Sequence, residues 1–303
     1  MSIFAETTVF AMEVRAKKAL GQHFLTDERI AQNIVAALLC DWNEAKPAPA
    51  GRPTPGLEVM AAGDSGKSCS PVLEVGPGMG VLTKYLLERE DIDLKLVEID
   101  GESVEYLLTH FPGMQGRLLQ ADFLTLPLER IFPERLSVIG NFPYNISSQI
   151  FFKILDNRER IPEVVCMIQK EVAERIAEKP GSKTYGILSV LLQAWYDIEY
   201  LFGVGPGCFA PPPKVDSAVI RLTRNGRTDL GCDGRLFTAI VKTAFGQRRK
   251  MMRNPLKPFI SAKADREGWN DGERAAFAAS PVFERRPETL SVEDFINLTN
   301  LLS

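Results

Sequence analysis

The residues with the most specific chemistry are Asn141-Phe142-Pro143-Tyr144, which follow a short apolar run. The amino group of adenine is a poor nucleophile because its lone pair is delocalised into the ring, so an enzyme that alkylates it must draw that nitrogen toward a tetrahedral geometry. The side-chain oxygen of Asn141 and a backbone carbonyl of the Phe142-Pro143 segment would accept its two N–H bonds, which favours the transition state over the planar ground state. Pro143 would fix the turn, and Tyr144 would stack on a base extruded from its helix. The motif therefore indicates alkylation of an adenine amino group; its structural alternative is an Asx-type turn that ends in a packed tyrosine.

A glycine-rich run with Gly76, Gly78 and Gly80 follows an earlier apolar segment. Backbone without side chains is suited to a place where a ligand approaches closely. The spacing G-x-G-x-G brings the third glycine one residue earlier than in dinucleotide-binding loops, and no Lys-Ser or Lys-Thr pair follows as in a P-loop. The run predicts a ligand loop without a phosphate cradle, the alternative being a merely tight strand-to-helix turn.

Two acidic residues, Glu98 and Asp122, close the next two apolar segments. Glu98 lies 22 residues after Gly76, where a carboxylate can accept both hydroxyls of a ribose. Asp122 could accept a hydrogen bond from an adenine amino group while Ile99 covers the ring. Either acid alone could be a surface carboxylate. Three strand ends in succession that carry glycines, an acid and an acid indicate a nucleoside site, and without a phosphate cradle they favour S-adenosylmethionine as the cofactor.

Apolar runs alternate with amphipathic ones from residue 71 onward, which predicts an α/β sheet with ligands bound beyond the strand ends. A helix is expected over 27–40 with Thr26 as its N-cap. Strands are expected at 72–75, 94–99, 117–121, 137–140 and 164–168, and helices at 101–110, 147–155, 169–178 and 186–195. Segments 196–204 and 217–223 would pair as an antiparallel edge.

The organisation changes after residue 225. Only helical patterns follow, at 235–245, 272–278 and 292–302, so we expect a large α/β domain over 1–225 and a small all-α domain over 226–303. Residues 43–70 are rich in Pro, Gly, Ala and Ser, which predicts a flexible insertion.

Charge is divided unevenly between these two parts. Residues 226–303 hold 13 Lys and Arg against 10 Asp and Glu, whereas residues 1–225 hold 23 against 29, and the whole chain carries a net charge of −3. Residues 242–257 include six basic side chains and no acidic one. Such a run can contact a phosphate backbone or can simply be a solvated helix face.

The composition excludes several classes. The 303 residues are 45 % hydrophobic and 25 % charged, which is typical of globular proteins. Five separated cysteines without a C-x-x-C pair, and only two histidines, argue against a disulfide scaffold, a zinc site and histidine catalysis. We see no membrane-spanning run and no secretory signal, so we expect a cytoplasmic protein without a metal or a membrane partner.

The same motifs, with others along the chain, resemble the KsgA-type (RsmA) small-subunit ribosomal RNA adenine dimethyltransferases. The resemblance covers about residues 15–300 outside the insertion. It is carried by 18–25, 74–80, 98–100, 121–123, 141–147, 209–217, 244–250 with 253–254, and 288–295.

This resemblance implies a class I S-adenosylmethionine-dependent methyltransferase with a Rossmann-like sheet and a small helical C-terminal domain. The family transfers four methyl groups from S-adenosylmethionine to the amino groups of two adjacent adenosines near the 3′ end of 16S rRNA, during small-subunit assembly. The implied partner is 16S rRNA within the small subunit or its precursor, and we expect a monomer.

The resemblance also implies roles for single residues. Catalysis would involve Asn141, Pro143, Tyr144 and, as a second stacking ring for the target base, Phe209. The cofactor would contact His23, Leu25, Gly76, Gly78, Glu98, Ile99, Asp122 and Asn141. RNA would contact Lys17, Lys18, Arg248, Arg249, Lys250 and Arg253.

Three positions depart from the family pattern: Phe142 stands where leucine is usual and would crowd the turn, His23 replaces the commoner asparagine, and the insertion is unexplained. Two alternatives remain, an Erm-like methyltransferase of 23S rRNA and a non-catalytic RNA-binding or transcription factor that keeps the fold. The C-terminal motifs favour the small-subunit family over the first, and intact Asn141, Tyr144, Glu98 and Asp122 argue against the second. A DNA adenine methyltransferase is disfavoured because its motif usually has two prolines before the tyrosine.

Overall fold

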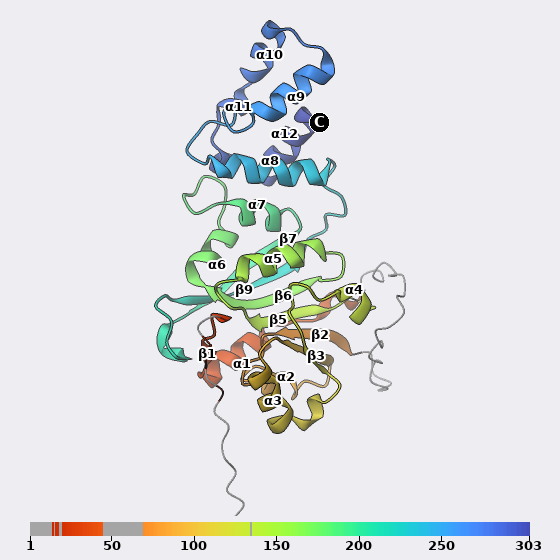
Figure 1. The fold of residues 1–303 in the computed structure, drawn as a ribbon, viewed down its shortest axis with the longest axis vertical. Helices are drawn as coiled ribbons and strands as arrows, with labels where there is room; N and C mark the ends of the chain where they lie inside the picture. The colour runs from red at the N-terminus through yellow and green to blue at the C-terminus, as the bar shows by residue number, and fades with distance from the viewer. Residues whose placement is uncertain (1–13, 15, 18–19, 45–68, 134) are drawn as a thin grey trace, which may run out of the picture.

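Seven strands form one sheet at the centre of the computed structural model, which describes residues 14, 16–17, 20–44, 69–133 and 135–303 (Figure 1). The first five strands in spatial order run parallel, and the last two are antiparallel to their neighbours. The expected α/β sheet with an antiparallel edge is therefore confirmed. The spatial order is β4 (Leu118–Gln120), β3 (Ile92–Glu98), β2 (Ser70–Val75), β5 (Ser137–Asn141), β6 (Glu163–Gln169), β9 (Ser217–Arg224) and β7 (Tyr196–Val204).

The central strands β2, β5 and β6 are nearly continuous apolar runs because helices cover both faces of the sheet. Leu73 and Val138, for example, have no exposed surface. At the C-terminal ends of β2 and β5 the backbones come so close that a Cβ on Gly140 would lie 2.4 Å from the carbonyl oxygen of Val75. Only glycine allows this approach, which sets the position of Asn141 next to the glycine-rich loop.

Helices cover the two faces of the sheet (Figure 1). One side holds α1 (Glu28–Ala36), α2 (Thr83–Leu86) and α3 (Gly101–His110), and the other holds α5 (Ser147–Asp156) and α7 (Ile187–Gln193). The short α4 (Leu128–Ile131) precedes β5, and α6 (Lys170–Ala177) follows β6. Two buried clusters result, one on each face.

The first helix differs from its expected bounds. Asp27, not Thr26, is its N-cap, because the Asp27 carboxylate accepts a hydrogen bond from the backbone N–H of Ile30. The Thr26 hydroxyl instead donates to the carbonyl of Cys208, 3.1 Å away. Thr26 is thereby part of a contact between segments far apart in the sequence, where β1 (Phe24–Leu25) pairs with β8 (Phe209–Ala210).

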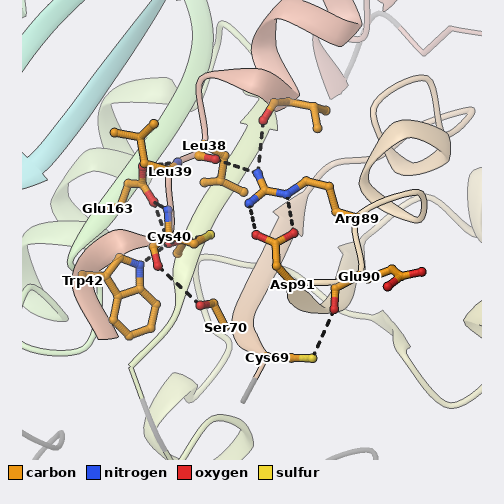
Figure 2. A network of polar contacts seen from close by, with 12 residues as sticks. Leu38, Leu39, Cys40, Trp42, Cys69, Ser70, Arg89, Glu90, Asp91 and Glu163 are labelled. Atoms are coloured by element: carbon orange, nitrogen blue, oxygen red, sulfur yellow. Dashed lines mark hydrogen bonds and ion pairs between the residues drawn. The ribbon is translucent and has the colours of Figure 1, made fainter. Parts of the chain in front are cut away.

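A polar network holds the end of α1 against the opening residues of β5 and β6 (Figure 2). Glu163 is 1 % exposed and accepts hydrogen bonds from the backbone N–H groups of Leu39 (2.8 Å) and Cys40 (3.0 Å) and from the hydroxyl of Ser137 (3.0 Å). Arg89 donates to the carbonyl of Leu38 at 2.6 Å. The network lies at the starts of the strands, opposite the strand ends that carry the predicted site.

The segment 43–70, predicted to be a flexible insertion, lies mostly outside the described residues. Of its ends, residues 43–44 belong to a short 3-10 helix, η2 (Asp41–Glu44), and Ser70 is already the first residue of β2.

Only helices follow β9, as expected; they lie at the top of Figure 1, where the first and the last of them pack on α7. They are α8 (Gly234–Gly246), α9 (Lys257–Glu267), α10 (Asp271–Ala278), α11 (Pro281–Glu284) and α12 (Val292–Leu302). Helix α9 was not predicted because Pro258 suggested a loop. Pro258 lies in its first turn, where a missing N–H leaves no hydrogen bond unmade. Among the described residues no helix is long and apolar enough to span a membrane.

Candidate functional site

A pocket opens at the C-terminal ends of β2, β3 and β5, where the sequence placed its candidate residues. Its wall includes the segment before α1, the glycine-rich loop, the ends of β3 and β4, and the turn after β5. The lining residues are 20–25, 74–79, 81–82, 97–99, 121–124, 141–146 and 150.

The glycine-rich loop needs glycine for two reasons. Gly76, Gly78 and Gly80 have φ angles of +68°, +55° and +78°, a region that other residues rarely adopt. A Cβ on Gly78 would lie 2.9 Å from the ring of Phe24, so the loop also packs closely against the segment before α1. A Cβ on Gly76 would meet no atom within 4 Å, because this glycine borders open space in the pocket.

Glu98 is held rigidly at the end of β3. Its side chain accepts hydrogen bonds from the backbone N–H groups of Gly78 (3.1 Å) and Asp100 (2.9 Å), one on each carboxylate oxygen. Burial raises the pKa of Glu98, and these backbone N–H groups oppose the rise by stabilising the charged form. The carboxylate is thus fixed by the loop that it helps to shape.

Two further predicted residues line the same pocket. One carboxylate oxygen of Asp122 accepts the N–H of Leu124 at 2.8 Å. The side chain of Ile99 is 52 % exposed, which is unusual for isoleucine and leaves an apolar surface for a flat ring. The structure therefore brings Gly76, Gly78, Glu98, Ile99 and Asp122 together.

Asn141 is the last residue of β5, and its amide orientation follows from its partner. Its nitrogen Nδ2 donates to the backbone carbonyl of His23 at 3.0 Å. A carbonyl can only accept, so the amide nitrogen must face it and the oxygen Oδ1 remains as an acceptor. Asn141, Pro143 and Tyr144 all line the pocket.

The ring of Tyr144 lies between two contacts at the edge of the pocket. Its hydroxyl shares a hydrogen bond with the hydroxyl of Ser217, the fully buried first residue of β9. The imidazole of His23 stacks on it, with 5.5 Å between ring centroids and 26° between planes. Nδ1 of His23 lies 2.8 Å from the carbonyl of Pro211 and therefore carries the proton. His23 faces the ring of Tyr144 as well as the pocket.

Two aromatic expectations need correction. Phe209 was expected to offer its ring to a base, yet it is 4 % exposed and lies in the buried cluster with Leu25, its partner in the β1–β8 pair. Phe142 was expected to crowd the turn, but its ring is fully buried and contacts Phe151 edge-on at 6.1 Å between centroids. The burial of Phe209 depends on a strand pair formed with a segment far away in the sequence, and that of Phe142 on how α5 packs against the turn.

Two of the predicted RNA contacts, both partly exposed, bind other groups of the protein. Lys17 forms ion pairs with Asp100 and with Glu102 (3.0 Å), and the hydrogen bond to Asp100 is the main cause of its raised pKa. It therefore ties the N-terminal segment to the turn after β3 rather than facing solvent freely. Arg248 donates to the carbonyl of Ser182 at 3.1 Å, between α6 and α7.

The remaining predicted RNA contacts differ in their surroundings. Arg253 lies 3.7 Å from the carboxylate of Glu284, whereas Arg249 and Lys250, which follow α8, are exposed. Lys18 lies outside the described residues.

Sequence reasoning missed Glu74, a carboxyl behind the glycine-rich loop. It is 1 % exposed, lines the pocket and accepts a hydrogen bond from the hydroxyl of Thr83 at 2.7 Å. Burial, together with the nearby charge of Glu98, raises the pKa of Glu74 to about 8. An acidic residue inside an otherwise apolar strand was the signal that could have revealed it.

No group of three or more His, Cys, Asp or Glu side chains in the described parts of the chain is arranged to hold a metal ion.

The model of the family described as ribosomal RNA adenine dimethylase matches residues 13–268. The ribosomal RNA small subunit methyltransferase A of Parabacteroides distasonis is 52 % identical over 286 residues, which are 94 % of this chain and 93 % of that protein. The protein of the same name from Porphyromonas gingivalis is 50 % identical over 293 residues, 96 % and 99 % of the two chains.

Solved structures agree at the level of the fold. A dimethyladenosine transferase from Plasmodium falciparum superposes with a TM-score of 0.68 at 21 % identity, covering 91 % of this chain and 96 % of that one. The 23S rRNA methyltransferase ErmE superposes with a TM-score of 0.56 at 24 % identity, covering 91 % and 99 %.

Proposed function

The chain belongs to the ribosomal RNA adenine dimethylase family, and from that premise we propose that it methylates 16S rRNA with S-adenosylmethionine as the methyl donor. The target groups are the N6 amino groups of two adjacent adenosines near the 3′ end of this RNA, each methylated twice, during assembly of the small subunit. One observation supports the proposal beyond family membership. Asn141 belongs both to residues 141–144, the asparagine-led turn, and to the wall of the nucleoside-type pocket.

The pocket fits the proposed methyl donor. Glu98 is fixed where it can accept from ribose hydroxyls, and Ile99 offers apolar surface to an adenine ring. Asp122 has one carboxylate oxygen engaged by Leu124 and a second to accept from the adenine amino group. The open space beside Gly76 leaves room for the backbone to approach the ligand. When bound, the sulfonium supplies an activated methyl group.

Acceptor activation falls to the turn after β5. Oδ1 of Asn141 accepts one N–H of the target amine, and a backbone carbonyl of the Phe142-Pro143 segment accepts the other. These acceptors would hold the two N–H bonds out of the ring plane, so that the lone pair leaves conjugation with the ring and can attack the methyl carbon while the bond from that carbon to sulfur breaks. The nitrogen, positively charged after this attack, would then release its proton to solvent. A strong general base is not required, because the sulfonium is a good leaving group.

Similarity to relatives favours the small subunit as the substrate. Chains about half identical over nearly their whole length are small subunit methyltransferases, whereas the ErmE likeness lies at the level of the fold. We also propose that the protein acts as a monomer in the cytoplasm, where the assembling particle is found.

The test is incubation with labelled S-adenosylmethionine and small subunits that lack these methyl groups, followed by mass mapping of the modified nucleosides. Dimethyladenosine at two adjacent positions near the 3′ end of 16S rRNA is expected. Label on 23S rRNA or DNA would refute the substrate. RNA binding without any methyl transfer would instead favour the non-catalytic alternative.

A further inference from the structure

Tyr144 is the partly exposed aromatic residue of the asparagine-led turn; Phe142 also borders the pocket, but its ring has no exposed surface. A ring that stacks on an extruded base must keep a fixed orientation, because small errors in the position of a reacting group are costly. Tyr144 follows a strand end and lies in a turn, and this part of the chain does not by itself fix a side chain. Its orientation must come from contacts with other segments.

Ser217 supplies such a contact from another strand of the sheet. It is the first residue of β9, has no exposed surface and is paired with Gln169 of β6 and Val204 of β7. Strands on both sides thus hold its backbone. A serine hydroxyl in this position is a rigid anchor, and the hydroxyl of Tyr144 is its hydrogen-bond partner. Burial raises the pKa of Tyr144, so the phenol keeps its proton for this bond.

A second restraint comes from His23, which is held by residues 209–216, the segment that runs from β8 to the start of β9. His23 stacks on the ring of Tyr144, and its imidazole is tied to the carbonyl of Pro211. This segment therefore holds the Tyr144 ring indirectly through His23, and Ser217, which follows it as the first residue of β9, holds the ring directly. The buried Phe209 at the start of this segment packs it onto β1.

We propose that Ser217 is a positioning residue for methyl transfer, whose hydroxyl fixes the Tyr144 ring in the orientation that stacks on the target adenine. The inference rests on the proposed function. The contribution of Ser217 lies in the chemical step, since it touches neither the cofactor residues Glu98 and Asp122 nor the basic surface.

A double-mutant cycle tests it. Ser217→Ala and Tyr144→Phe remove the two ends of one hydrogen bond, and Tyr144→Phe keeps the stacking ring. Each should lower the single-turnover rate roughly five- to tenfold, the effect of one net hydrogen bond, with S-adenosylmethionine affinity unchanged. The double variant should be no slower than either single variant.

The matched control is Thr299→Val, which removes another buried hydroxyl, one that donates to the carbonyl of Phe295 in α12. It should alter thermal stability and leave the rate unchanged. Ser217→Ala should also alter stability but, unlike the control, should lower the rate.

Three outcomes would overturn the inference: a Ser217→Ala rate equal to wild type, effects that add in the double variant, or a loss in Tyr144→Phe far beyond that of Ser217→Ala. The last would place the phenol hydroxyl on the substrate itself. An inactive wild-type protein would refute the proposed function instead. If Ser217→Ala does not fold, the test rests on Tyr144→Phe alone. A Tyr144→Phe rate equal to wild type would then refute the inference, because the tyrosine hydroxyl would not orient the ring.

Discussion

Replacing Asn141 with alanine should abolish most of the methyl transfer while leaving the pocket intact. One polar atom of the side chain is already occupied, since Nδ2 donates to the carbonyl of His23. Oδ1 is therefore the acceptor that the variant loses. Removing one preorganised hydrogen-bond partner of a transition state lowers kcat by about 10²- to 10³-fold. Glu98 at the end of β3 and Asp122 just after β4 keep their backbone partners, so the affinity for S-adenosylmethionine should change only a few-fold.

Asn141→Asp sharpens this test. It retains an acceptor but places an oxygen against the carbonyl of His23, where a donor is required. The unpaired contact should lower the rate by roughly tenfold or more even though the side chain has the same size. The measurement is single-turnover methylation of undermethylated small subunits, with cofactor and RNA affinities determined separately. Asn300→Ala, which removes a similar amide bond to a backbone carbonyl far from the pocket, is the control. A rate for Asn141→Ala within tenfold of wild type would refute the proposed role.

Other side chains give predictions of different kinds. Lys17→Ala should weaken S-adenosylmethionine binding by about two- to fivefold, the value of a largely exposed ion pair, without changing the salt dependence of RNA binding. Calorimetry measures the first effect and a salt titration of RNA binding the second. The double variant Arg249→Ala/Lys250→Ala should weaken RNA binding for all sequences and reduce the slope of log affinity against log salt concentration by about 1.4 to 1.8. Arg248→Ala should mainly lower the free energy of unfolding in urea, because the guanidinium of Arg248 binds a backbone carbonyl. Glu74→Gln should gain stability relative to wild type as the pH rises from 4.5 to 8, because the carboxyl of folded wild type keeps its proton up to a pKa of about 8, whereas the unfolded chain has already released it. Urea unfolding at both pH values measures this, and an equal difference in the free energy of unfolding between variant and wild type at both would contradict the assignment.

The residues found from the sequence share a simple physical basis. Gly76, Glu98, Asp122 and Asn141 each follow an apolar run, and parallel strands present their C-terminal ends at one edge. A local pattern then predicts a three-dimensional cluster. The bounds of α3, β7 and α12 were also predicted to the residue, because strong periodicity and clear turn signals mark both ends.

What the sequence missed depends on contacts between distant segments. Lys17 was named only as a candidate RNA contact, and its ion pair with Asp100, 83 residues away, was not predicted. The burial of Phe209 depends on pairing with Leu25. No period or spacing contains this information, because a two-residue strand such as β1 has too few residues to show a pattern.

The two halves of the site therefore differ in how their sequence signals arise. The cofactor half is built from backbone turns at strand ends. Each glycine or acidic residue there is needed for its own backbone geometry or charge, so it can be recognised from its type and position alone. The acceptor half needs a side chain, Tyr144, whose orientation depends on Ser217, 73 residues further along the chain. A residue that acts only by holding another carries no chemistry of its own and cannot be found from its type. Its role becomes visible when the fold brings β9 next to β6, which places a buried hydroxyl beside the turn that β5 begins.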